Sequence, residues 1–230
     1  MKTLLLVSLF GAAFLRVAAD EPAANSVRQI QVEIQIIALP IEDALPLIEP
    51  LRDDKRIEKT VTKLHEMIAN KNAKLIGWPM IITKSGNRAD VECIDESTIY
   101  ESIPRDPTVA QKELERSLKT QFLTGCQMPT FEMRYVGVTL EIEPTISTSE
   151  SHIDIQLIPQ HVSLTRTDKI RALVGGKRVI IEQPTFHTNQ ISTTLTLSDG
   201  QRILLDTFNT SKPEGWMELF ILKASIIVTK

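Results

Sequence analysis

The stretch that decides the fold is Tyr135–Ser147, YVGVTLEIEPTIS, in which apolar and polar residues alternate. A strand places successive side chains on opposite faces of a sheet, so a period of two indicates a strand with one face on a core and the other in water. We predict that Gly137 allows a close approach of the backbone and that Pro144 follows the strand. The side chains predicted in the core are Val136, Val138, Leu140 and Ile142.

Similar alternation recurs along the chain and predicts about seven strands. A hairpin is expected between residues 73–82 and 88–94, around a turn at 85–87. Asp199 and Gly200 are expected to turn one strand back on the next and to set the register of a second hairpin. The other predicted strands lie at residues 29–38, 135–147, 153–157, 191–197, 201–205 and 218–228.

One clear helix is predicted at residues 54–69, because apolar residues recur there at helical spacing, at Ile57, Val61, Leu64 and Ile68. Residues 41–51 contain Pro46 and Pro50, which allow at most a short helical turn. We therefore expect this segment to be a packed connector. Strands in the majority with one or two helices predict an α+β, β-rich fold with a mixed or antiparallel sheet.

The N-terminus has the layout of a secretory signal peptide, with Lys2, an apolar run over residues 4–15 and a small-residue site ending at Ala19. A membrane anchor is the alternative, but a spanning helix needs about 20 apolar residues and this run is shorter. We predict that residues 1–19 are removed and that 20–26 form a flexible tail. Removal of Lys2 and Arg16 changes the net charge from −3 to about −5, which disfavours nucleic-acid binding.

Residues 102–129 are predicted to be an insertion, because Pro104 and Pro107 interrupt the strand pattern and a polar, helix-tolerant stretch follows. Its apolar residues fall every four positions and form a narrow helical stripe. We expect a helix on the domain surface. An element that inserts into a membrane or binds a partner is the alternative.

Cys93 and Cys126 are the two cysteines of the chain. In an oxidising compartment a disulfide between them is possible, and the loop-entropy model gives it roughly 3 to 4 kcal/mol of stabilisation. The alternative is two unpaired, buried thiols, since free cysteine packs as a small hydrophobic residue. Cys93 lies on the apolar side of its predicted strand.

No catalytic, cofactor or metal site is predicted. The four histidines are scattered, without an HExxH pair or a zinc-like spacing, and no Gly-x-Ser-x-Gly motif is present. His161 and His187 are expected in loops beside prolines. An enzyme would need a pocket that gathers one of them with an aspartate or glutamate, so we predict a protein that is not an enzyme.

Five segments, in order, resemble the C-terminal domain of the bacterial secretins, the outer-membrane proteins of type II and III secretion and type IV pilus systems. This resemblance covers nearly all of residues 27–230 and implies a secretin-core fold and a role in protein secretion. The segments are RQIQVEIQIIAL, NAKLIGWPMIITKSGNRADVECIDE, YVGVTLEIEPTIS with HIDIQLIPQHVSL, QPTFHTNQISTTLTLSDGQRILLDTF, and ELFILKASIIV.

The resemblance implies an exported protein at the outer membrane or in the periplasm of a Gram-negative-type bacterium, with copies of itself or other envelope components as partners. Two departures accompany it. Residues 206–208 replace the paired glycines of the family, and residues 209–217 leave no room for the segment associated with its transmembrane hairpins. The alternative is a soluble periplasmic structural or binding module that reuses the fold without forming a channel.

Overall fold

The computed structural model describes residues 27–100, 131–174 and 177–229. The predicted signal peptide, tail and insertion lie outside these ranges and stay predictions. The described residues form ten strands and two helices, which confirms the β-rich α+β class. The elements are β1 Val27–Pro40, α1 Ile41–Leu51, α2 Ile57–Ala69, β2 Lys74–Gly77, β3 Met80–Lys84, β4 Ala89–Tyr100, β5 Phe131–Ile146, β6 His152–Val174, β7 Lys177–Gln190, β8 Thr193–Ser198, β9 Arg202–Asn209 and β10 Trp216–Thr229.

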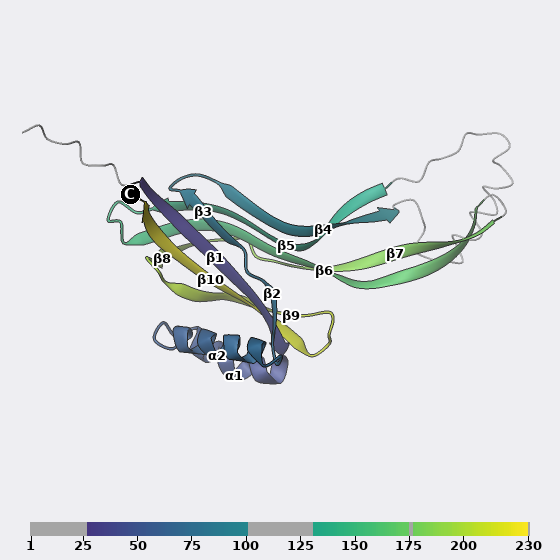
Figure 1. Ribbon diagram of the computed structural model, residues 1–230, viewed down its shortest axis with the longest axis horizontal. Helices are drawn as coiled ribbons and strands as arrows, with labels where there is room; N and C mark the ends of the chain where they lie inside the picture. The colour runs from purple at the N-terminus through teal and green to yellow at the C-terminus, as the bar shows by residue number, and fades with distance from the viewer. Residues whose placement is uncertain (1–26, 101–130, 175–176, 230) are drawn as a thin grey trace, which may run out of the picture.

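The strands form two five-stranded antiparallel sheets rather than the single sheet that we expected. Sheet A has the order β2-β1-β10-β9, with β3 also paired to β1, and sheet B has the order β4-β5-β6-β7, with β8 also paired to β6. Figure 1 shows the helices against sheet A, with sheet B on the other side of it. The physical reason is that β1 and β10 carry apolar side chains on both faces where the end of β1 pairs with the start of β10, with Ile37 and Leu219 on the face turned away from sheet B, so sheet A needs cover on both sides there.

The core between the sheets, called here the inter-sheet core, receives the predicted face of β5. Val138, Leu140 and Ile142 are at most 5% exposed, whereas Val136 is only half-buried. Pro144 is buried inside β5, which continues to Ile146 instead of ending before it. Since the pairing of β4 with β5 ends at Ile142, the missing N–H of Pro144 costs no hydrogen bond to β4.

The second core lies between sheet A and the helices. Residues 41–51 form a helix of 11 residues, not a connector, despite Pro46 and Pro50. Ala44, Leu47 and Leu51 are buried against sheet A, and such packing outweighs weak helix propensity. The second helix begins at Ile57, three residues later than predicted, because Asp53 accepts hydrogen bonds from residues 55–57 and holds a turn there.

Neither predicted hairpin forms. β3 pairs with β1 in sheet A while β4 pairs with β5 in sheet B, and β8 and β9 are divided between the sheets in the same way. Each of these two turns therefore crosses from one sheet to the other. Gly200, with a φ of +74°, occupies the second crossing turn, and the Asp199 carboxylate accepts a hydrogen bond from the Ile226 N–H at 2.7 Å. Both flanking strands can then face one core from opposite sides.

Sheet B divides at Gly137. β4 and β5 pair from Ala89–Ile142 to Tyr100–Phe131, but the pairing of β5 with β6 begins only at Gly137. β4/β5 and β6/β7 consequently continue as two separate pairs of strands beyond sheet A, toward the right of Figure 1. No helix in the described part of the chain is long and apolar enough to cross a membrane.

Gly137 occupies this position with a φ of +138°, which favours glycine. A Cβ added there would lie 2.2 Å from the backbone oxygen of Cys93, so the neighbouring strand would have to move. Both the backbone conformation and the close approach of β4 thus require a residue without a side chain.

We predict that Gly137→Ala destabilises the protein by about 2 kcal/mol more than Gly86→Ala, measured by urea unfolding followed by tryptophan fluorescence. Gly86 is a matched control, because it also has a positive φ (+77°) but nothing lies within 4 Å of an added Cβ. Equal losses of stability in the two variants would show that the contact between the added Cβ and the backbone of β4 does not destabilise the protein.

Candidate assembly surfaces

Both sheets are open on the same two sides of the molecule. β3 and β4 follow each other through one crossing turn and form one side, and β8 and β9 follow each other through the other and lie on the opposite side with β7. Within the described residues, β4 is paired only with β5, β7 only with β6, and β9 only with β10. An edge strand presents unpaired N–H and C=O groups, which can pair with a strand of another chain.

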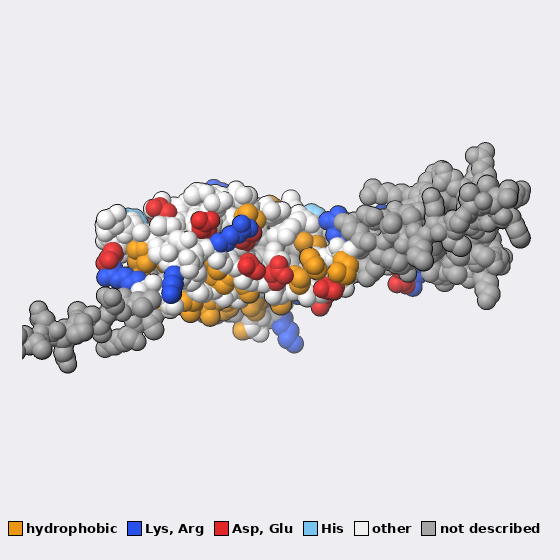
Figure 2. Space-filling model, turned by 90° about the horizontal axis from the view of Figure 1, so that it is seen from above, with side chains coloured by type: hydrophobic (Ala, Val, Ile, Leu, Met, Phe, Trp, Pro, Cys, Tyr) orange, Lys and Arg blue, Asp and Glu red, His pale blue; other side chains and the backbone are white. Residues whose placement is uncertain are grey.

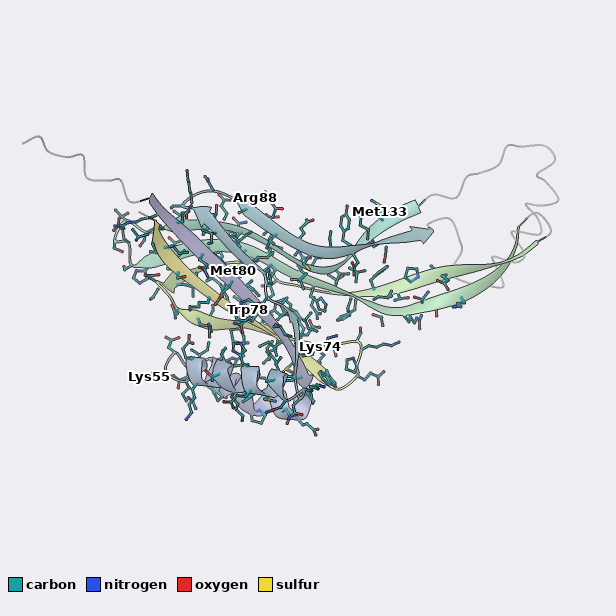
Figure 3. The ribbon with its side chains drawn as sticks, in the orientation of Figure 1. Lys55, Lys74, Trp78, Met80, Arg88 and Met133 are labelled. Carbon is teal, nitrogen blue, oxygen red and sulfur yellow. The ribbon has the colours of Figure 1, made fainter. Side chains whose placement is uncertain are left out.

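Exposed apolar side chains lie along the β3 side. Trp78, Met80 and Ile82 are 46%, 54% and 52% exposed. Figure 3 shows Trp78 and Met80 together on the edge of sheet A, between the helices and sheet B. In Figure 2, hydrophobic side chains gather along one long side of the described surface, with charged ones across its middle. Apolar groups beside an open strand edge are typical of a surface that is covered in an assembly.

The β4 edge is acidic. Asp90, Glu92, Asp95 and Glu96 are all exposed, and β4 contains no basic residue. Charges on an edge strand oppose unspecific pairing between identical edges, because like charges repel. The surface beside β4 also contains an open cavity of about 470 Å³, lined by acidic, polar and apolar residues of β4, β5, β6 and β7 and by Arg88. The acidic β4 edge therefore favours pairing with an edge strand other than the β4 strand of another copy.

The predicted structural residues fall into two places. The first place is the part of β5 that runs from the division of sheet B into the inter-sheet core, and it contains Val136 to Ile142. Pro144, Asp199 and Gly200 lie at the other end, where both crossing turns bond to sheet B: the Gly86 N–H donates to the Pro144 carbonyl of β5, and the Asp199 N–H donates to Ser151 O in the turn after β5. The structure thus assigns the second group to joining the sheets and not to the register of a hairpin.

Cys93 is exposed on β4, which corrects the expectation of a buried position. It lies opposite Val138, beside the division of sheet B, where sheet A covers less of sheet B. Cys126 lies outside the described residues, so the disulfide stays a prediction.

A buried polar cluster that sequence reasoning missed joins the two sheets. Glu218 on β10 is 3% exposed and continues the inward row that contains Phe220 and Leu222. Its two carboxylate oxygens lie 3.0 and 3.1 Å from Nδ1 of His161 on β6, and one of them accepts a hydrogen bond of 2.9 Å from Nδ2 of Asn189 on β7. A glutamate at an inward position of an otherwise apolar strand is the signal that could have revealed it.

Two expectations about histidines need correction. His161 and His187 lie in strands β6 and β7, not in loops, because β6 extends well beyond the predicted residues 153–157 and β7 was not predicted as a strand. The His161 and Asn189 positions are direct cross-strand neighbours. That pairing, rather than a loop, brings the imidazole and the amide to the same carboxylate.

The environment of Glu218 favours its ionised form. Burial raises the pKa of this carboxyl group, but hydrogen bonds from His161 and Asn189, with the charges of His161 and His187, outweigh burial and lower the pKa below its usual value. A carboxylate bonded in this way stabilises the contact between β10 and sheet B. Removing its partners would leave a buried charge, which is costly.

This cluster meets half of the condition for an enzyme, since it gathers a histidine with a glutamate. It lacks the other half: Glu218 and Asn189 are less than 5% exposed, and neither they nor His161 lines the cavity beside β4. No group of three or more histidine, cysteine or acidic side chains in the described part of the chain could hold a metal ion. What the arrangement can do is hold two sheets together.

Comparisons with known proteins point to one family. The family model described as secretin, bacterial type II and III secretion system protein, matches residues 66–206, more than half of the chain. No curated protein matches the sequence. The family assignment therefore rests on the family model.

Several solved structures are similar at low identity. One is the secretin InvG of the Salmonella SPI-1 type III secretion injectisome (12% identity, 88% of this chain, 66% of that chain, TM-score 0.46). Another is the type II secretin GspD of enteropathogenic Escherichia coli (12%, 88%, 70%, 0.44). A third is the type IV competence pilus secretin PilQ of V. cholerae (11%, 88%, 62%, 0.42). The chain spans just under two thirds of the InvG and PilQ chains.

We predict that Glu218 makes stability depend on pH in the acidic range. Because its pKa is lower in the folded than in the unfolded state, its contribution is complete above the unfolded-state value and is lost as the pH falls through the folded-state value. In urea unfolding at several pH values, Glu218→Gln should give a flatter pH dependence in this window and cost about 1.5 kcal/mol at pH 7. The exposed Glu143→Gln is the control, and a Glu218→Gln curve parallel to that of the wild type would contradict the assignment.

Proposed function

This chain belongs to the secretin family of bacterial type II and III secretion system proteins, and from that premise we propose that it is a structural, non-enzymatic subunit of a protein-secretion assembly. Its place is the outer membrane or its periplasmic side, in a Gram-negative-type bacterium. Its partners are copies of itself or other envelope components. The family assignment supports the role in secretion, and the open sheet edges support the mode of assembly.

The single observation that carries this proposal is that β4 and β7 are both open and run in opposite directions. β4, β5, β6 and β7 are paired antiparallel in sequence, so β7 of one copy placed beside β4 of the next continues the same antiparallel sheet. This contact joins two different surfaces, and repeated contacts of that kind close into a ring when the rotation allows. Ring closure would pair the open β4 and β7 edges of every copy.

Sheet A supports the same contact. Its open strands β3 and β9 lie on the same two sides as β4 and β7, so one neighbour on each side would meet both sheets. The exposed Trp78, Met80 and Ile82 would then be covered by the next copy. Burial of such side chains is a main source of stability in protein interfaces.

A second candidate function is a soluble periplasmic structural or binding module, and one observation favours it. Only residues 210–215 connect β9 to β10, so no further hairpin lies between these two strands. Such a module would use the same two-sheet scaffold to bind an envelope partner without forming a ring.

The oligomeric state separates these candidates. We expect the exported protein, purified from the cell envelope in mild detergent, to form closed rings of uniform size by negative-stain electron microscopy and light scattering. Mass spectrometry of the same sample should show an N-terminus at Asp20. A protein that is monomeric with and without detergent over a wide concentration range would exclude the ring and support the module.

A proline pair on β4 tests the edge itself. Successive N–H groups of a strand point to opposite sides, so one of Asp95→Pro and Glu96→Pro removes a bond to β5 and the other removes only an outward N–H. We expect the second kind of variant to keep wild-type circular dichroism and to lose ring formation. Proline at Glu143, on a central strand, should reduce folding itself and serves as the comparison. A folded β4 variant that still forms rings would show that this edge is not the contact.

A further inference from the structure

We propose that Glu218, His161 and Asn189 form an acid-sensitive latch that holds the base of the β6/β7 hairpin against sheet A. These residues are called the latch below. The proposal goes beyond assembly, because it concerns a movement within one subunit. It stands on the position of the cluster and on the chemistry of its groups.

The latch lies where the hairpin leaves the sandwich. His161 and Asn189 face each other across β6 and β7, and β10 of sheet A supplies Glu218. The next polar contact outward is between Thr165 and Ser211, at 3.1 Å. From Leu164, which is 48% exposed, the hairpin continues away from sheet A. Among the described side chains, the latch is therefore the outermost attachment of this hairpin that contains fully buried groups.

The groups around the carboxylate make the attachment sensitive to acid. From sheet B, Glu218 meets His161 on β6 and Asn189 and His187 on β7, whereas its neighbours within sheet A are the apolar Ala38 and Phe208. Nε2 of His187 is buried and has no hydrogen-bond partner. Glu218 is thus the one anionic group in a cluster with two imidazoles.

Acid reverses the balance of charge. An ionised Glu218 accepts from both the imidazole and the amide, and it offsets positive charge on the histidines. Once it takes up a proton, one acceptor oxygen becomes a donor, and the His161 imidazole and the Asn189 amide lose their anionic acceptor. The expected result is that β6 and β7 separate from β10 at this point, while the apolar part of the inter-sheet core stays packed.

Hydrogen exchange measured by mass spectrometry on the full chain tests the latch, with rates corrected for the intrinsic effect of pH. In the wild type between pH 6 and pH 3, amides of residues 160–168 and 184–190 should lose protection about 10-fold more than those of residues 30–36 and 220–224. Glu218→Gln should show the same local loss already at pH 6, since it removes the charge-assisted hydrogen bonds to the carboxylate.

Two further variants make the result unambiguous. Asn189→Ala keeps the Glu218–His161 contact and should give an intermediate loss at the same residues, so it serves as the test if Glu218→Gln does not fold. The exposed Glu143→Gln should behave as the wild type. Unchanged protection of the hairpin base in both latch variants, or an equal loss in residues 30–36, would overturn the proposal, because the cluster would then be either inert or merely part of global stability.

Discussion

The arrangement depends on one constraint, the burial of both faces of sheet A where the end of β1 pairs with the start of β10. Ile34 and Ile36 point into the inter-sheet core, whereas Ile37 and Leu39, after a shift of register, point to the helices. A strand pair that is apolar on both sides cannot lie at a surface, so the chain must supply a layer on each face. The two helices provide one layer, and sheet B provides the other.

The sequence pattern was sufficient for elements but not for their partners. Alternation located β1 and β5 and identified the buried face of β5, because burial of one face imposes a period of two, and a continuous apolar run located β10. It could not show which strand lies across from which. The two turns expected to close hairpins instead cross between sheets, since a short polar turn with a glycine fits both geometries. The helix over residues 41–51 was missed because prolines lower propensity, while packing on sheet A is a tertiary effect.

The candidate surfaces were predictable only in part. The resemblance of five segments led to the correct family, and the idea of paired edges followed from it. The identity of the open edges required the strand order, which no local pattern contains. The Glu218 cluster could not be predicted because its residues come from three strands that are distant in sequence. The one signal was a glutamate just before Leu219 and Phe220 in an otherwise apolar strand. Buried polar groups are informative because they must find partners.

The two ends of the sandwich differ, and this gives the subunit a direction. Both crossing turns and the turn between β5 and β6 are bonded together at one end, while two pairs of strands diverge from Gly137 at the other. Copies related by rotation about a single axis keep the same orientation along it. A ring built from this chain would therefore carry the bonded turns of all copies on one side and their diverging strand pairs on the opposite side. Its two openings would differ in structure.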